Sequence, residues 1–147
     1  MTVPKGSPQL ATPSSFHSSP CPFCDRLNDG AFAESSKHTV AFPDRYPVTP
    51  GHHLIVPRRH VLDFFQLSPQ EQADLWRLVA RVRDRVFLDH SPDGINVGMN
   101  VGQAAGQTIG HAHVHVIPRY TGDVADPRGG VRWVVPDRAV YWEGRKE

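Results

Sequence analysis

Three histidines at alternate positions of an apolar, β-branched run, His111, His113 and His115, constrain this chain more than any other feature. Successive side chains of a β-strand point to opposite faces, so these imidazoles line one face and their apolar neighbours line the other. Imidazole nitrogens need hydrogen-bond partners and titrate near neutral pH, which makes such a face costly in an ordinary core. The pattern therefore predicts a strand that presents a chemical site.

Two kinds of chemistry fit this histidine face. Alternate histidines on one strand can converge on a zinc ion, which would make the protein a metalloenzyme with all three as ligands. Alternatively, the central imidazole can act as a nucleophile that its neighbours orient and supply with protons. The histidines alone leave both alternatives open.

A loop punctuated by glycines precedes the histidine strand. Between Asn100 and Gly110, three glycines free the backbone to approach a ligand, and Gln107 and Thr108 add neutral hydrogen-bond donors. A plain hairpin turn also uses glycines. Next to a row of imidazoles, however, the combination is typical of a loop that cradles phosphate.

These residues carry a family resemblance. The segment Gly106–Arg119 resembles the signature of the histidine triad (HIT) superfamily of nucleotide hydrolases and transferases, and Ala41–His60 resembles its N-terminal half. The similarity covers roughly residues 20 to 125 in the same order. The chain is identified as a member of this superfamily, in the bacterial-type branch that carries a zinc knuckle, and it is similar to dinucleoside polyphosphate hydrolases.

The resemblance implies the reaction and its central residues. His113 would attack the α-phosphate of a nucleotide and form a nucleotidyl-imidazole intermediate, which water then hydrolyses with release of AMP. His115 would hydrogen-bond a phosphate oxygen, and His52 would support this pair. The substrate would be an adenine nucleotide conjugate, either a dinucleoside polyphosphate or a nucleoside phosphoramidate. Two alternatives remain: a nucleotide-binding or sensing module without turnover, and a nucleotidyl transferase or phosphorylase.

The same resemblance implies the nucleotide contacts. Gln107 and Thr108 match donors to the phosphate and to the bridging or leaving-group oxygen. Asn100 matches a polar residue beside that group, and Gly106 belongs to the same nucleotide-binding loop. Asp44 matches the acidic residue that accepts hydrogen bonds from the ribose hydroxyls.

The two cysteines form a C-x-x-C motif, Cys21 and Cys24, which suits a redox pair, a disulfide or half of a four-ligand metal site. A reduced cytoplasmic setting argues against a structural disulfide. In relatives with this motif, the resemblance implies that His60 and His111 complete a structural Cys2His2 zinc site. The other two triad histidines would then remain for catalysis, with no organic cofactor.

Length and charge favour a small enzyme. A chain of 147 residues suits one domain, and 16 Lys plus Arg against 15 Asp plus Glu give no basic field for polymeric nucleic acid. No apolar stretch could span a membrane or serve as a secretion signal, so a cytoplasmic location is expected. Residues 1–20, with four prolines and five serines, predict a flexible arm before a single domain over 21–147, with a C-terminal tail from about residue 125.

The periodicity predicts an α+β fold. Short strands are expected at Thr39–Phe42, His53–Val56 and Ile95–Asn100, before the histidine strand, with one long helix from Pro69 to about Asp89. The resemblance implies a HIT-like antiparallel meander sheet, one shorter helix, and a homodimer whose sheets join across a two-fold axis.

The C-terminal tail leaves an open alternative about the substrate. Arg119 and Arg128 could contact phosphates beyond the first, which would favour a polyphosphate-bridged dinucleotide over a phosphoramidate. They suit solvated surface positions equally well. Trp133 and Trp142 are costly to leave in water, so the tail is expected near a partner subunit's site.

Overall fold

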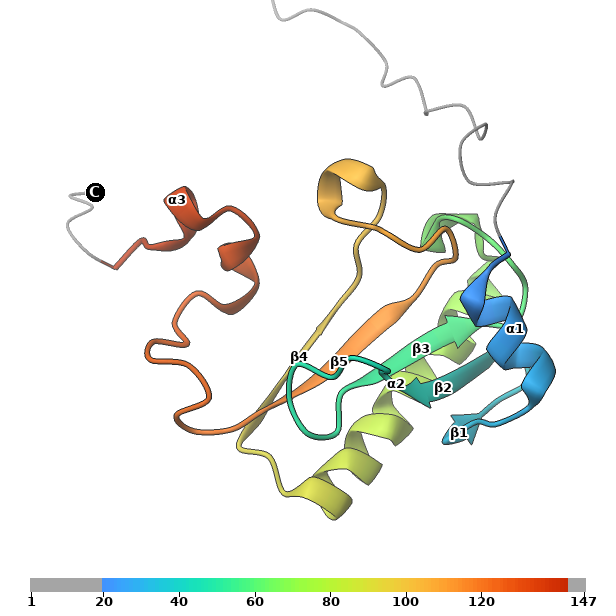
Figure 1. Cartoon of the computed structure of the whole chain (residues 1–147), viewed down its shortest axis with the longest axis horizontal. Coiled ribbons are helices and arrows are strands. Elements are labelled where there is room, and N and C mark those ends of the chain that lie inside the picture. The colour runs from blue at the N-terminus through green and yellow to red at the C-terminus, as the bar shows by residue number, and fades with distance from the viewer. Residues whose placement is uncertain (1–19, 143–147) are drawn as a thin grey trace, which may run out of the picture.

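A computed structural model describes residues 20–142 and confirms the α+β fold (Figure 1). The strands are β1 (Glu34–Ser35), β2 (Thr39–Pro43), β3 (His53–Pro57), β4 (Gly94–Gly98) and β5 (Val114–Arg119). The α-helices are α1 (Pro22–Asp29), α2 (Pro69–His90) and α3 (Pro136–Ala139), and 3-10 turns occur at Phe64–Gln66, Gln103–Ala105 and Gly130–Val134. The predicted arm lies outside the described residues apart from Pro20.

The five strands form one antiparallel sheet in the order β1-β2-β3-β5-β4. This order departs from a simple meander at one place, because the long α2 crossover carries the chain past β5 and leaves β4 at the sheet edge. The predicted hairpin between β4 and the histidine strand is present. Within residues 20–142, no helix is both long and apolar enough to cross a membrane.

Residues at each end of helix α2 determine where it begins and ends. The Ser68 hydroxyl accepts from the Glu71 amide while the Glu71 carboxylate accepts from the Ser68 amide, so a capping box starts the helix. Pro69 occupies the first turn, where its missing N–H costs nothing. The helix ends at His90, and the C-cap residue Ser91 adopts the left-handed conformation.

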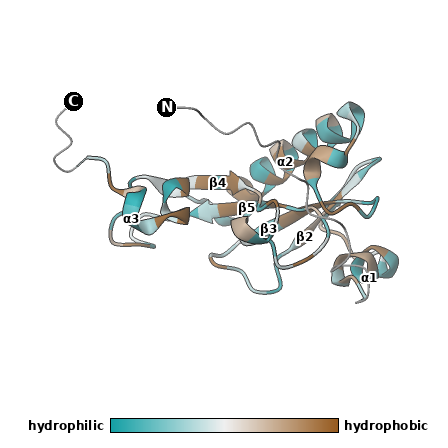
Figure 2. Ribbon diagram, turned by 90° about the horizontal axis from the view of Figure 1, so that it is seen from above, coloured by the Kyte–Doolittle hydropathy of each residue, from teal (hydrophilic) through white to brown (hydrophobic). Residues whose placement is uncertain are grey.

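The sheet is covered on both faces, and the two coverings are different (Figure 2). Helix α2 buries Leu75, Leu78 and Val82 against the sheet face that carries Ile55 and Val114. On the opposite face, the short helix α1 buries Phe23 among side chains of β2 and β3, and its partly buried Leu27 packs against the same cluster. The face opposite α2 is therefore partly open, and the alternating side chains of β5 reach it.

The histidine strand is shorter than predicted. β5 begins at Val114, because pairing with β3 stops at Ile55. Continued pairing would bring Ala112 opposite Pro57, which has no N–H to donate. Ala112 instead donates its N–H to the Val61 carbonyl at 2.7 Å. His111 and His113 therefore lie in a non-regular segment just before the strand, where the backbone can turn them in different directions.

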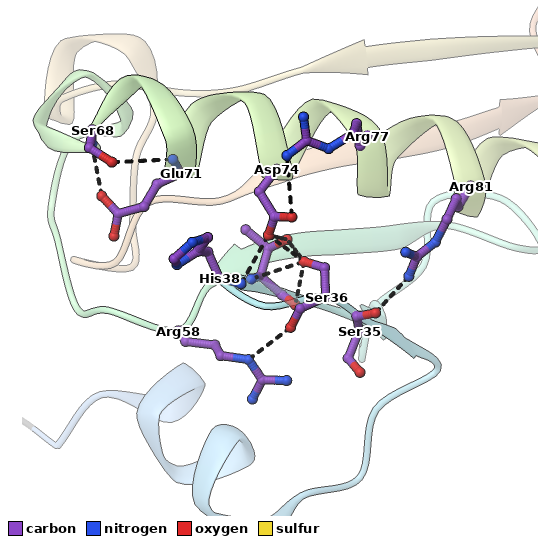
Figure 3. A network of polar contacts seen from close by, with 10 residues as sticks. Ser35, Ser36, His38, Arg58, Ser68, Glu71, Asp74, Arg77 and Arg81 are labelled. Atoms are coloured by element: carbon purple, nitrogen blue, oxygen red, sulfur yellow. Dashed lines mark hydrogen bonds and ion pairs between the residues drawn. The ribbon is translucent and has the colours of Figure 1, made fainter.

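A buried carboxylate ties α2 to the turn between β1 and β2 (Figure 3). Asp74 accepts hydrogen bonds from the Ser36 hydroxyl, from the His38 N–H at 2.9 Å and from the Thr39 hydroxyl at 3.3 Å. Burial alone would raise the pKa of Asp74, but these donors lower it below its ordinary value.

Replacing Asp74 with alanine is expected to cost about 2–4 kcal/mol of unfolding free energy, because three donors lose their common acceptor. Asp84→Ala, on the exposed face of the same helix, should change it by less than about 0.5 kcal/mol. Urea denaturation of both variants measures the difference. Equal effects of the two substitutions would show that the buried carboxylate contributes nothing specific.

Candidate active site and metal centre

A pocket of about 660 Å³ opens on the sheet face opposite α2. It brings together residues from distant parts of the chain that the sequence singled out: Asp44, His52, Asn100, Gly106, Thr108, His113 and His115. Its apolar wall includes Phe23, Leu54 and Ile109, which sequence reasoning did not identify. A volume of this size suits a nucleotide-sized ligand.

His113 is held with one defined nitrogen free. Its Nδ1 lies 2.8 Å from the His111 carbonyl oxygen, which can only accept, so Nδ1 carries the proton. In the neutral imidazole, the lone pair is therefore on the other ring nitrogen, Nε2. The Phe23 ring packs edge-on against this imidazole, with the ring centres 5.2 Å apart. Because His113 is only 9% exposed, these contacts fix the orientation of its imidazole.

His52 and His115 form a second, linked pair. The Val48 N–H donates to His52 Nδ1 at 3.3 Å, which places the His52 proton on Nε2. That Nε2 lies 3.0 Å from His115 Nδ1 and donates to it. The proton of neutral His115 is then on its own Nε2, where it can be donated. Asp44 Oδ2 lies 3.4 Å from His52 Nε2, an ion-pair distance that the sequence did not reveal.

Both linked histidines favour the neutral form. Burial, with smaller contributions from the neighbouring His113 and His52 and against the opposing effect of Asp44, lowers the pKa of His115 to about 4. Burial likewise lowers the pKa of His52 from its ordinary value, with Asp44 acting in the opposite direction. At neutral pH the pair therefore carries one proton on each ring.

Thermal stability is expected to fall between pH 6.5 and 4, because the unfolded chain binds a proton at His115 near pH 6.5 and the folded chain only near 4. From pH 7 to pH 5 the melting temperature should drop by about a few degrees, and His115→Asn should make the drop smaller. Calorimetry at the two pH values measures this. An identical drop in wild type and variant would contradict the burial of neutral His115.

The loop between Asn100 and Gly110 lies along the pocket, but not all of its polar side chains face the pocket. Thr108 and Asn100 line the pocket, as does Gly106. Gly106 has φ of +87°, a left-handed conformation that favours glycine. Gln107, by contrast, is buried and fully engaged, since its amide donates to the Leu62 and Ile109 carbonyls and accepts from an N–H of the loop. Its position suits bracing of the loop rather than direct contact with phosphate.

A second cluster joins the two cysteines to two histidines. The ligand atoms of Cys21, Cys24, His60 and His111 all lie within 4.8 Å of one another. Three sulfur–nitrogen separations are 3.3, 3.4 and 3.7 Å. Tetrahedral zinc with ordinary Zn–S and Zn–N bonds places such atoms about 3.6 Å apart. The cluster could therefore hold a metal ion with little rearrangement.

The surroundings of the cluster also suit a metal. His111 Nε2 lies 2.8 Å from the Pro57 carbonyl and donates to it, which leaves Nδ1 as a ligand atom on the side of the cysteines. Burial, followed by the adjacent Cys21 sulfur, raises the pKa of the Cys24 thiol to about 11. The thiolate form of both cysteines is therefore stable only with a cation between the two sulfurs, which a divalent metal supplies.

The structure separates the three triad histidines. Among residues 20–142, His111 clusters with the cysteines, whereas His115 clusters with His52 and Asp44. No such cluster in this part of the chain contains His111, His113 and His115 together. The alternative in which all three bind one zinc ion therefore has no geometric support.

Comparisons with known proteins agree with this geometry. The family described as "HIT domain" matches residues 28–122. An uncharacterised HIT-like protein of Saccharolobus solfataricus is 35% identical over 106 residues, covering 70% of this chain and 76% of that protein. A bis(5'-adenosyl)-triphosphatase of Saccharomyces cerevisiae is 34% identical over 111 residues, which is 74% of this chain but only 50% of that enzyme.

Among solved structures, a zinc-bound histidine triad family protein from Mycobacterium smegmatis superposes with a TM-score of 0.66 at 30% identity. The match covers 72% of this chain and 79% of that protein.

Proposed function

The chain belongs to the HIT domain family, and on that premise we propose that it is a nucleotide hydrolase acting at the α-phosphate of adenine nucleotide conjugates, with release of AMP. The proposed substrates include both phosphoric anhydrides and phosphoramidates, which are the two classes that the family resemblance implies. The observation that carries the proposal is the free Nε2 of His113 in a pocket of nucleotide size.

The first step uses His113 as the nucleophile. Its Nε2 lone pair forms a bond to the α-phosphorus as the bond from phosphorus to the leaving group breaks. The His111 carbonyl accepts a hydrogen bond from Nδ1–H, which stays protonated, and so stabilises the positive charge that develops on the ring. The departing atom takes up one proton from solvent, and the nucleotidyl group remains on His113.

The second step returns the enzyme to its starting state. Water attacks the same phosphorus, the phosphorus–nitrogen bond breaks, and AMP leaves while the water gives back the proton taken up in the first step. We assign hydrogen bonding to the phosphate to His115, because its bond from His52 leaves the Nε2–H as a donor. His52 is then a positioning residue, which sets the tautomer of His115.

The pocket offers a partner for each part of the nucleotide. Asp44 can accept from the ribose hydroxyls, and Thr108 and Asn100 can donate to phosphate oxygens at the open end of the loop. Phe23 and Leu54 provide the apolar surface against which a base would pack. Gln107 holds the loop in place through its main-chain bonds.

The proposed metal is zinc, held by Cys21, Cys24, His60 and His111. When bound, it supplies a cross-link rather than chemistry, because all four positions of a tetrahedral ion are taken by protein. It would join helix α1 to the segment that carries the nucleophile. This site leaves the roles of His113 and His115 unchanged.

A cytoplasmic homodimer remains part of the proposal. Strand β4 lies at the edge of the sheet with half-buried residues, and Val131 and Val134 of the C-terminal segment are exposed. Light scattering is expected to give twice the chain mass at micromolar concentration. A monomer mass under those conditions would contradict the dimer.

The proposed function is tested with purified protein and four substrates: diadenosine triphosphate, diadenosine tetraphosphate, an adenosine phosphoramidate and adenylyl sulfate. Chromatography of the products should show AMP from at least one of them. Tight nucleotide binding without AMP release from any substrate would replace the hydrolase by a sensing module or by a transferase that needs a second substrate.

A further inference from the structure

The metal cluster and the proposed nucleophile are joined by direct contacts. Two of the contacts that orient the His113 imidazole are its 2.8 Å bond to the His111 carbonyl and the edge-on Phe23 ring, whose centre lies 5.2 Å away. His111 is itself one of the four cluster residues. Phe23 lies between Cys21 and Cys24 in the sequence. A change in the cluster therefore acts on both of these contacts.

The cluster also provides the N-terminal attachment of helix α1. This helix spans eight residues, and its N-cap residue Cys21 makes no side-chain capping hydrogen bond. A helix of this length is marginal by itself in water. Phe23 is buried and Leu27 is partly buried against β2 and β3, and the Arg26 guanidinium lies 4.1 Å from the centre of an aromatic ring of β2. Loss of a metal bound by Cys21 and Cys24 would release the end of the helix that carries Phe23.

The two cysteines can also form a bond with each other. Both are free thiols, and their sulfur atoms lie within 4.8 Å of one another. Residues three apart in a helical turn have Cα atoms about 5 Å apart, which is within the range that a disulfide bridges. Both side chains are half-buried, and the neighbouring His60 is exposed. A small oxidant can therefore reach the cluster from solvent.

We propose that Cys21 and Cys24 are a redox switch that controls the orientation of His113, with hydrogen peroxide as the oxidant. The inference rests on the proposed zinc site and hydrolase function. In the reduced protein both cysteines bind zinc as thiolates. One thiolate attacks peroxide and breaks its O–O bond, which gives a sulfenic acid and hydroxide. The second thiolate attacks that sulfur and displaces another hydroxide, so the sulfurs lose two electrons, a disulfide forms, and the cluster releases its zinc.

Oxidation then disturbs the nucleophile from two sides. Helix α1 loses its attachment to His60 and His111, so the Phe23 ring no longer packs at a fixed position against His113. The His111 ring loses its metal bond, and the carbonyl that accepts from His113 belongs to the same residue. A misplacement of about 1 Å at a reacting group costs on the order of 100-fold in rate. Phe23 is thus a positioning residue, and the oxidised protein should have a kcat lower by about that factor.

The test follows zinc, disulfide and turnover during a peroxide titration of the reduced zinc protein. A chromogenic zinc indicator should report one zinc ion released per chain. Mass spectrometry should show a loss of about 2 Da in the peptide that contains both cysteines. The kcat should fall in parallel with both signals. After removal of the released zinc, dithiothreitol should reopen the disulfide, but the kcat should return only when zinc is also added.

Cys24→His is the variant that cannot switch, because histidine replaces the thiolate as a zinc ligand but cannot form a disulfide. It should bind zinc and keep it during the titration. Met99→Leu is the matched control for methionine oxidation, since Met99 packs against the hydrophobic core and does not line the nucleotide pocket. It should respond to peroxide as the wild type does. If Cys24→His binds no zinc, the reversal experiment on the wild type decides the question.

Imidazole NMR signals separate this inference from the proposed hydrolase function. The His113 ring signal, assigned by its absence from His113→Ala, should shift or broaden on oxidation and return with reductant and zinc. The His53 signal should not change, because that ring is held by the Gly51 carbonyl outside the pocket. If the wild type turns over no substrate, the hydrolase proposal fails while these signals still decide the switch.

Four results would overturn the inference. They are reduced protein that holds no zinc, peroxide-treated protein that keeps its zinc, zinc release without a disulfide, and a His113 signal that does not change on oxidation. A kcat that stays above half its initial value after complete zinc release would also contradict the control of the nucleophile by the cluster.

Discussion

Replacement of His113 by alanine is expected to lower kcat by a factor on the order of 10⁴ or more on whichever substrate the wild type cleaves. The free Nε2 of this side chain is the proposed nucleophile, and alanine leaves no atom that can form the bond to phosphorus. Nucleotide affinity should stay within about tenfold, because the ribose, phosphate and base contacts come from other residues. Single-turnover kinetics and equilibrium binding measure the two quantities separately.

His53→Ala is the matched control for this substitution. His53 is the immediate neighbour of His52, but its Nδ1 donates to the Gly51 carbonyl and its side chain does not line the pocket. Its loss should change kcat by less than about twofold. If His113→Ala keeps more than about one tenth of the wild-type kcat, the nucleophile is another group and the proposed mechanism is wrong.

The second large effect is expected at the metal cluster. Cys24→Ser should abolish zinc binding and lower the melting temperature by about 10 °C or more, because a ligand at 1,000 times its Kd contributes about 4 kcal/mol to folding. Elemental analysis of the purified proteins gives the metal content, and calorimetry gives the melting temperature.

A chelator provides the matched comparison for this variant. It should lower the melting temperature of the wild type to nearly that of Cys24→Ser and leave the variant unchanged. The two remaining interpretations of the cysteines predict something else: a disulfide or redox pair would respond to a reductant and not to a chelator. Wild-type protein without metal, together with a response to reductant alone, would contradict the zinc site.

Local patterns predicted the elements of this fold better than their arrangement. The capping box at Ser68 and the helical spacing of Leu75, Leu78 and Val82 are contained in one stretch of chain, and α2 formed as they indicate. The position of β4 at the edge, beyond β5, depends on which strands pair after a long crossover. Such pairing is decided by tertiary packing, which no local pattern records.

The sequence pattern likewise predicted the histidine strand but not how each histidine is placed in the fold. Alternation predicted one shared face, and His113 and His115 do line one pocket. His111 instead faces the cysteines, because the regular strand starts only at Val114 and the Pro57 carbonyl binds the His111 ring. The resemblance to a family, rather than the alternation itself, suggested this separation.

Several contacts of the site had no signal in the sequence. The proximity of Asp44 to His52 and the edge-on packing of Phe23 against His113 join residues from separate elements. The sequence suggested Gln107 as a hydrogen-bond donor to a ligand. In the structure, its amide instead donates to the Leu62 and Ile109 carbonyls. A buried amide must satisfy its polar atoms, and in this fold the nearest partners are main-chain groups.

The most direct test of the account is to trap the covalent intermediate. Wild-type protein is mixed with excess substrate, quenched within milliseconds at alkaline pH, digested and analysed by mass spectrometry. The account predicts one nucleotidyl group on the imidazole of His113, absent from the His113→Ala variant, formed and lost at rates that match AMP release. A nucleotidyl group on any other residue, or AMP formation with no protein-bound nucleotide at any time, would contradict it.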